Sequence, residues 1–371
     1  MFDGLSFGWR TATLTVAFVQ LLLLAIALAR TLQNRTANRT MALLLIVLAG
    51  IITPWMIGFS GFYDKWRWLT FAPFQITLAV GPLFWFYAHA LVHGSWPAQA
   101  RRHLTLPALQ LLFFSGSFLL PMPQKEQWAD IISFPAGLIF GLLLVVSLIA
   151  YSFAAHLLLG DYRGALATAR SDDHRYAARW LQAALAALAL LLLVWTAYLF
   201  WDLVSPLGYK GLMGLYIAIA LFALYLGVEA WRHAALPFPT LADLTPVNDP
   251  LPAPKDWKAL GERWAAQVRD AGWDQDSELS LPLLARRLGT NTGHLSRAIN
   301  EGLGVNFSAF VNDLRSRRVA KMLNAGRTDD LLDLALEAGF SSKASFNRAF
   351  AASLGSTPSA YRAKVNRRLK S

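Results

Sequence analysis

The sequence predicts an all-α protein: a seven-helix transmembrane bundle followed by a cytoplasmic domain of two helix-turn-helix units joined by a connecting helix. Three observations predict this fold class. Hydrophobic residues make up 55% of the 371 residues, which is unusual for a soluble protein. Apolar runs fill most of residues 1–233. Residues 281–371 then repeat one pattern, in which a helix, a glycine and a second helix follow each other.

The apolar part contains seven runs long enough, or nearly so, to cross about 30 Å of hydrocarbon as helices. The fourth run is short, and the fifth is long enough to tilt or to kink at Pro135. The first run also resembles a signal peptide, but three arginines follow it at once, which favours a retained span. The runs lie near residues 11–29, 41–60, 69–92, 104–120, 131–159, 180–201 and 211–231.

The positive charges of the loops predict the orientation, because loops rich in Lys and Arg stay in the cytoplasm. One set of loops holds Arg30, Arg35, Arg39, Arg101, Arg102, Arg163, Arg170, Arg175 and Arg179. The opposite set holds Arg10, Lys65, Arg67, Lys125 and Lys210. This bias of nine to five places the N-terminus outside and the C-terminal domain in the cytoplasm.

Few ionisable residues fall inside the predicted spans. His89, His156 and Glu229 lie near the inner ends of the third, fifth and seventh runs. Because buried charge is costly in a membrane, each is a candidate for sensing a signal. Their shallow depth favours the simpler explanation that these side chains reach the membrane interface.

A proline-rich stretch separates the two parts of the chain. Between residues 234 and 256, six prolines exclude a continuous helix and favour extended polyproline-type chain. Such a spacer would reach roughly 60 Å at about 3.1 Å per residue. We therefore predict a transmembrane domain at 1–233, a linker at 234–256 and a DNA-binding domain at 257–371.

The first helix-turn-helix pattern begins after Ser280, a suitable N-cap, and its first helix ends at Gly289. Asn291 is placed to cap the second helix, which we predict over residues 292–303. The pattern then recurs, with a helix over 331–338, Gly339, and a second helix over 343–354 capped by Ser342. An apolar stripe within residues 307–323 predicts the connecting helix that fixes the distance between the two units.

The charge of this region favours nucleic acid or anionic lipid as a partner. Residues 281–371 hold 15 Lys and Arg against 6 Asp and Glu, a net charge of +9. Cysteine is absent, which excludes disulfides and thiolate metal sites. Gly-rich phosphate loops, His-rich metal spacings and nucleophile elbows are absent too, so we expect no catalytic site, no metal, no cofactor and no enzyme activity.

Residues 257–371 resemble the DNA-binding domain of the AraC/XylS family of bacterial transcription regulators. The resemblance is carried by ALEAGFSSKASFNRAF at residues 335–350 and GSTPSAYR at residues 355–362. The first unit matches at Leu295-Ser-Arg297, at Asn300 and at Asn306-Phe307. The family's usual N-terminal part is a soluble ligand-binding barrel, from which this chain departs. It looks like the membrane-anchored members, which implies a multi-pass protein of the bacterial inner membrane.

A recognition helix places its outward residues against base edges in the major groove. On the first such helix the outward candidates are His294, Ser296, Arg297 and Asn300, while Gly293 supplies no side chain. Arg297 is the first candidate for a base contact, because guanidinium to guanine is the commonest specific contact; a phosphate contact is the alternative. On the second helix the resemblance assigns the reading face to Lys343, Ala344, Asn347 and Arg348.

Other basic residues have less specific interpretations. A solvated or salt-bridged face is expected for most of Arg315, Arg317, Arg318 and Lys321 on the connecting helix. The basic C-terminal tail, residues 362–370, would touch phosphate or the anionic inner leaflet.

The leading hypothesis is a membrane-bound, sequence-specific transcription regulator that couples a membrane or extracytoplasmic signal to gene expression. Double-stranded DNA of a promoter or operator and the lipid bilayer are its expected partners. RNA polymerase is a possible further partner, and the chain could also form a homodimer. The sequence does not identify the signal ligand. The alternative is a membrane enzyme or transporter with an accessory nucleic-acid-binding domain. A third hypothesis is that the helical bundle only anchors the DNA-binding domain to the membrane and has no sensing role.

Overall fold

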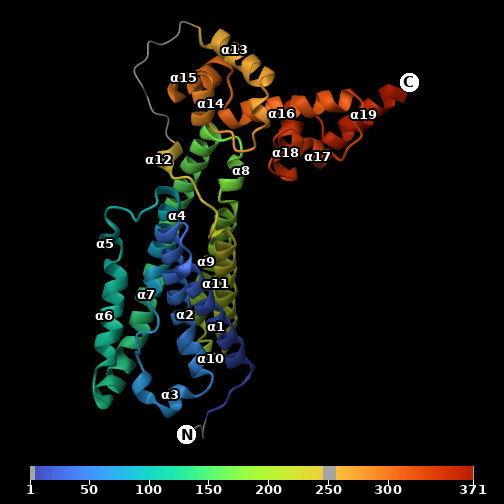
Figure 1. The fold of residues 1–371 in the computed structure, drawn as a ribbon. Coiled ribbons are helices and arrows are strands. Elements are labelled where there is room, and N and C mark those ends of the chain that lie inside the picture. The colour runs from blue at the N-terminus through green and yellow to red at the C-terminus, as the bar shows by residue number, and fades with distance from the viewer. Residues whose placement is uncertain (1–4, 245–255, 371) are drawn as a thin grey trace. The chain divides into compact units, whose positions relative to one another are not determined.

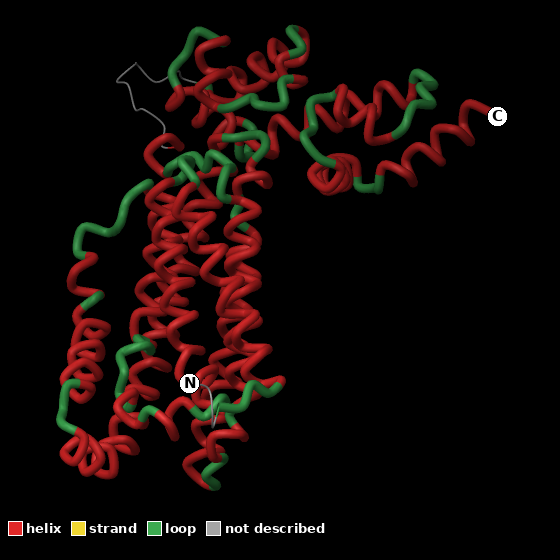
Figure 2. Tube along the Cα trace, turned by 60° about the horizontal axis from the view of Figure 1, so that its bottom comes forward, coloured by secondary structure: helices red, strands yellow, loops and turns green. Residues whose placement is uncertain are grey.

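The computed structural model describes residues 5–244 and 256–370, and over these residues it contains helices and loops but no strand, which confirms the all-α class (Figure 2). The chain forms two compact bodies. The apolar body comprises Met1–Leu159 and Arg179–Thr240. The C-terminal body comprises Gly160–Ala178 and Leu241–Ser371. The stretch Gly160–Ala178 therefore belongs with the helix-turn-helix units although it lies within the apolar part of the sequence, and part of the predicted linker, residues 245–255, lies outside the described residues.

Five helices of the described chain are long and apolar enough to cross a membrane. These are α1 (Trp9–Arg30), α2 (Arg35–Gly58), α7 (Met122–Ala169), α9 (Arg179–Val204) and α11 (Met213–His233). They coincide with the first, second, fifth, sixth and seventh predicted runs. The fourth run forms α6 (Thr105–Phe118), which at 14 residues is shorter than a usual span. The count of seven spans is therefore not confirmed.

The third predicted run, 69–92, is not one continuous helix. Its second half forms the 14-residue helix α4 (Val80–His93), preceded by a 3-10 turn, η2 (Thr77–Ala79). Before that the chain turns irregularly, with Phe71 in the left-handed region at φ 64° and Pro73 close behind. Proline lacks the N–H of a helical bond and disfavours helical backbone at the preceding residue, so the run is broken here.

Short elements connect the helices of the apolar body. They are α3 (Phe62–Lys65), η1 (Arg67–Leu69), α5 (Ala100–His103) and α10 (Gly208–Gly211). The buried core lies where α1, α2, α4 and α11 pack together (Figure 1). Leucine and alanine are its commonest residues, and Gly227 of α11 allows close approach, since a Cβ there would lie 2.9 Å from Leu24 and 3.1 Å from Leu45. Near the other end of α11, Trp55 stacks on Tyr216 with ring centroids 4.2 Å apart.

The helices of the C-terminal body follow the predicted order. After α8 (Asp173–Tyr176) and α12 (Leu241–Leu244) come α13 (Trp257–Asp270) and a 3-10 turn, η3 (Trp273–Gln275). The first helix-turn-helix unit consists of α14 (Leu281–Arg287), α15 (Thr292–Arg297) and the π-helical turn η4 (Ala298–Gly302). The connecting helix is α16 (Phe307–Asn324). The second unit consists of α17 (Leu331–Glu337) and α18 (Lys343–Leu354), and α19 (Pro358–Lys370) follows.

Each helix-turn-helix unit has its own apolar core, and α16 contributes to both. Its N-terminal half supplies Phe307, Phe310, Val311 and Leu314 to the core of the first unit. Its C-terminal half supplies Val319, Ala320 and Leu323 to the core of the second. In Figure 1, α13, α14 and α15 gather at one end of α16, and α17, α18 and α19 at the other. The predicted connecting helix is confirmed, since one continuous helix carries both units.

Candidate nucleic-acid interface

The turn of the first helix-turn-helix unit is built as its sequence predicts. Gly289 adopts φ +65°, and Asn291 caps α15 by accepting a hydrogen bond from the backbone N–H of His294 at 2.7 Å. Ser280 stands at the N-cap position of α14 in extended conformation but makes no side-chain capping bond. The first turn of α14 contains Pro282, whose missing N–H would need no helical partner there.

The second unit repeats this construction with its own caps. Asp330 accepts from the N–H of Leu332 at 2.7 Å, and Ser342 accepts from the N–H of Ser345 at 3.2 Å. Gly339 turns the chain at φ +95°, and a Cβ there would lie 2.6 Å from the carbonyl oxygen of Gln275. Only glycine fits this position, because both the backbone angle and the close approach exclude a side chain.

The predicted reading face of α18 is exposed. Lys343, Ala344, Asn347 and Arg348 all lie on the solvent side of the helix, as their spacing requires. Phe346 and Phe350, on the opposite side, are buried in the core of the second unit. The helix therefore presents two cationic side chains and one amide to a partner. Their contacts with DNA stay a prediction.

The predicted reading face of the first unit is less open. Arg297 and Asn300 are exposed, whereas His294 and Ser296 are half-buried. The ring of His294 lies edge-on to that of Trp257, with centroids 5.4 Å apart. Asn300 donates to the hydroxyl of Ser296 at 3.2 Å. Three of the four predicted residues thus have contacts within the body, and Arg297, whose Nε lies 4.0 Å from the carboxylate of Glu301, is the exposed cation of this helix.

The basic residues of α16 have structural partners. Arg317 pairs with Asp313 at 2.7 Å. Arg318 forms two bonds, of 2.8 and 2.9 Å, with the carboxylate of Asp274. Both findings agree with the predicted salt-bridged face. Lys321 is exposed.

Arg315 is different, because its side chain is buried within the body. It is 1% exposed, and its guanidinium donates to the carbonyl oxygens of Asp274 at 2.7 Å and Asp276 at 2.8 Å. It also donates to the hydroxyl of Ser171 at 3.1 Å. Burial lowers the pKa of Arg315 to about 10, while nearby carboxylates, Asp274 foremost, oppose the shift. At neutral pH the group is therefore a buried cation held by three oxygen acceptors.

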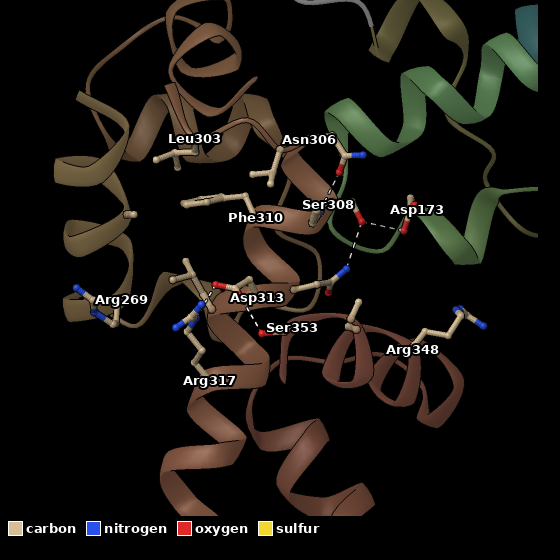
Figure 3. A pocket seen from close by; sticks show the side chains of 17 residues that line it. Asp173, Arg269, Leu303, Asn306, Ser308, Phe310, Asp313, Arg317, Arg348 and Ser353 are labelled. Atoms are coloured by element: carbon tan, nitrogen blue, oxygen red, sulfur yellow. Dashed lines mark hydrogen bonds and ion pairs between the residues drawn. The ribbon is translucent and has the colours of Figure 1, made fainter. Parts of the chain in front are cut away.

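A hollow of about 770 Å³ lies between α13, α16 and α18 (Figure 3). On its wall the carboxylate of Asp313 accepts from Arg317 of its own helix and from the hydroxyl of Ser353 of α18 at 2.5 Å. Asp313 therefore ties the second reading helix to the connecting helix. Arg348 also borders the hollow, and in Figure 3 its guanidinium points away from Asp313.

Residues Gly160–Ala178, which we call the docking segment, form part of the same body. The N–H and the hydroxyl of Ser171 both donate to the carbonyl oxygen of Leu279, at 3.3 and 2.8 Å. Glu278 accepts from Arg170 at 3.1 Å and from Arg175 at 3.0 Å. These contacts fix the docking segment against the residues that lead into α14.

A second group of contacts joins the docking segment to the connecting helix. The hydroxyl of Ser308, in the first turn of α16, donates to Asp173 at 3.1 Å. Asp172 is buried and accepts from Arg170 at 2.7 Å. The helical part of the segment buries Tyr162 and Leu166 completely. The segment thus contacts the residues that precede α14 and the first turn of α16.

Sequence patterns alone do not reveal the docking segment. By charge, Arg163, Arg170, Arg175 and Arg179 indicate only the orientation of a loop. The sequence offers one clue, a cluster of four charged residues in which Asp172 and Asp173 stand between Arg170 and Arg175. Such a cluster predicts ion pairs. It does not name Glu278, more than one hundred residues later, as the partner.

The candidates for signal sensing do not come together. The ring of His89 is half-buried, and its Nδ1 lies 2.8 Å from the carbonyl oxygen of Ser95. His156 is exposed. Glu229 accepts from Arg232 at 2.6 Å on its own helix. Nothing in this arrangement joins the three residues in one site.

Comparison with known proteins identifies the C-terminal region. Residues 284–364 match the family model described as "Helix-turn-helix domain", of the AraC type. Over 85 residues the chain is 40% identical to uncharacterized HTH-type transcriptional regulators of Staphylococcus aureus strains MSSA476 and N315. The match spans 23% of this chain and only 11% of those relatives. The resemblance to AraC/XylS regulators is confirmed for this region.

A solved structure is also similar: the C-terminal domain of AraT, a response regulator from Geobacillus stearothermophilus. The two share 24% sequence identity, with a TM-score of 0.25, over 28% of this chain and 84% of that chain.

Proposed function

We propose that the protein is a membrane-bound, sequence-specific transcription regulator whose two helix-turn-helix units read one operator. The DNA-binding and regulatory classes agree with the matched family and with the descriptions of the relatives. The observation that carries the specific proposal is the pair of units held on α16, with Arg297 exposed on one reading helix and Lys343 and Arg348 on the other. A single continuous helix would hold two reading helices at a set separation, as neighbouring major-groove segments require.

We further propose that the docking segment is the route by which the apolar body influences DNA binding. It directly follows the part of α7 that belongs to the apolar body. Its contacts reach Leu279 before α14 and Ser308 in α16. A displacement of α7 would therefore act first on these two helices. A signal would shift the equilibrium only by binding two such arrangements with different affinity.

The test uses the full-length protein in lipid nanodiscs. Double-stranded DNA would be selected from a random library, and binding of the selected sequence would be titrated against unrelated DNA at several salt concentrations. We expect the selected sequence to bind at least about a thousandfold more tightly than unrelated DNA. If all DNA sequences bind equally and binding falls steeply with salt, the proposal of a sequence-specific regulator is wrong. The binding would then come from a cationic surface that attracts any DNA.

A further inference from the structure

A large cavity of the apolar body has no assigned role. Its volume is about 720 Å³, which falls within the range of small-molecule sites. It is lined by residues of α2, α3, α6, α7, α9 and α11 and by the irregular segment around residues 70–77. A second cavity of about 280 Å³ shares Ser133, Gly137, Trp195, Leu199 and Tyr216 with it. The two are therefore neighbouring parts of one space.

The lining is aromatic and uncharged. Eight of the nineteen residues are Phe, Tyr or Trp, including Trp55, Phe113, Phe140 and Trp195. The remaining polar groups are hydroxyls and amides, and none of the described residues lining this larger cavity carries a charge. Asp202 lines the smaller cavity and would repel an anion. Aromatic faces with a few neutral polar groups suit an uncharged, largely apolar molecule.

The broken backbone beside this cavity is held by specific contacts. The side chain of Gln110 is buried, accepts from the N–H of Leu78 at 3.0 Å and donates to the hydroxyl of Thr77 at 3.0 Å. Phe71 lines the cavity in the left-handed region, at φ 64°. An aromatic residue is rarely held in this conformation, and such strain gathers at ligand sites.

A further contact shows why the segment can lie so close to α2. At Gly50 an added Cβ would lie 2.3 Å from the carbonyl oxygen of Phe74. In a protein that spans a membrane, non-helical backbone at membrane depth is tolerated where it lines a cavity or is buried in protein. Interrupted helices of this kind form the binding sites of many transporters. Cavity, strained lining and broken helix therefore coincide at one place.

We infer that this cavity binds one uncharged aromatic amphiphile, a compact molecule with a hydrogen-bonding group at one end. Trp55, Phe113, Phe140 and Trp195 would enclose its apolar body. Gln75, Thr70 and Ser133 are lining residues with neutral polar groups for its polar end. The assignment of this ligand as the regulator's signal rests on the proposed function. The binding itself does not.

The experiment compares two probes that differ in charge. N-phenylnaphthylamine is an uncharged aromatic fluorophore, and anilinonaphthalenesulfonate is the same framework with a sulfonate. Each would be titrated into the full-length protein in nanodiscs, with energy transfer from tryptophan as the signal and empty nanodiscs as the blank. We expect saturable binding of the neutral probe at one site per chain, at least about tenfold tighter than binding of the anion. Equal affinity for both probes, or no saturable binding, would overturn the inference.

Gly137 allows a sharp mutational test, because it lines both cavities and a Cβ there would meet nothing within 4 Å. Gly137→Phe should fill the space and weaken binding of the neutral probe at least about tenfold. Gly116→Phe is the matched control, since Gly116 is an exposed helical glycine with equally open surroundings on α6. Ala136→Leu offers a second filling variant should Gly137→Phe not fold. Unchanged binding in the folded filling variants would overturn the proposed site.

Lipid acyl chains are the competing occupant of the cavity. Repeating the titration in detergent micelles distinguishes them from a small-molecule ligand. Saturable binding in micelles that disappears in nanodiscs would mean that acyl chains fill the cavity, and this would overturn a small-molecule site. Binding retained in nanodiscs supports it. The assay contains no DNA, so a failure here would leave the proposed DNA-binding function untouched. A failure of operator selection would equally leave the cavity's ligand intact.

Discussion

Arg315 donates to the hydroxyl of Ser171 at 3.1 Å, although 144 positions separate the two residues in the chain. The cation belongs to α16, which connects the two helix-turn-helix units, and the hydroxyl belongs to the part of the docking segment between α7 and α9. The same guanidinium holds two backbone carbonyls before α14. One buried side chain therefore joins the three parts of the C-terminal body.

Arg315→Met should strongly destabilise the C-terminal body. The substitution leaves the carbonyl oxygens of Asp274 and Asp276 and the hydroxyl of Ser171 without their donor, at a cost of about 3 kcal/mol. Arg317→Met on the same helix is the control, because its ion pair is 64% exposed on the arginine side and contributes less than about 1 kcal/mol. Hydrogen exchange of residues 274–279 in the full-length protein measures the difference. Similar protection in both variants would contradict the structural role of Arg315.

Glu278→Gln should loosen the docking segment without touching the reading helices. It removes the charge that pairs with Arg170 and Arg175, two partly exposed ion pairs that together stabilise by about 1 kcal/mol. Tryptic cleavage after these two arginines should therefore quicken about fivefold, since it follows the population of the opened segment. Glu262→Gln, an exposed change on α13, serves as the control. Equal cleavage rates in the two variants would show that Glu278 does not hold the segment.

The turn glycines of the two units should respond unequally to alanine. Both adopt positive φ, so each substitution carries a backbone strain of about 1 kcal/mol. At Gly289 the added methyl meets nothing within 4 Å, whereas at Gly339 it collides with backbone atoms of Asp274 and Gln275. Gly339→Ala should therefore lose at least about 3 kcal/mol of stability. Urea unfolding, monitored by hydrogen exchange, measures the stability of the two variants. Equal losses of stability would exclude the close approach at Gly339.

Arg297→Ala and Arg348→Ala should each weaken binding to the selected operator by about 1–3 kcal/mol. Lys321→Ala, on the exposed face of the connecting helix, should change it less than about twofold. The salt dependence separates the roles, since a lost phosphate contact lowers the salt slope by about one and a lost base contact relaxes specificity instead. If neither arginine variant changes the operator affinity, the DNA-contacting residues do not lie on α15 and α18 as proposed.

The proposed orientation can be tested with single cysteines, because the natural chain has none. Ser205, between α9 and α10, is proposed to face outward, and Ala98, between α4 and α5, to face the cytoplasm; both are exposed. A membrane-impermeant maleimide should label Ser205→Cys in intact cells and Ala98→Cys only after lysis. The reverse pattern would invert the topology and remove the DNA-binding region from the cytoplasm.

The sequence predicts local structure well where local rules decide it. Asn291 and Ser342 cap their helices, and the apolar stripe of α16 yields one connecting helix, because these features depend on neighbours in the chain. Hydropathy alone did not locate the break near Phe71, since the residues there are as apolar as a span. From its helical spacing on the connecting helix, Arg315 is also expected to be solvated or salt-bridged at the surface. Its burial depends on Ser171, which no periodicity connects to it.

The discontinuous C-terminal body limits what a single cut in the chain could release. The chain passes between the two bodies at three places, after Leu159, after Ala178 and after Thr240. A protease acting once, in the stretch after Thr240, would free a fragment that has left Ser171 behind and has lost an acceptor for Arg315. Severing the chain there would not release an intact C-terminal body, so for the membrane-bound regulator proposed above, cleavage at that single site should be a poor means of activation.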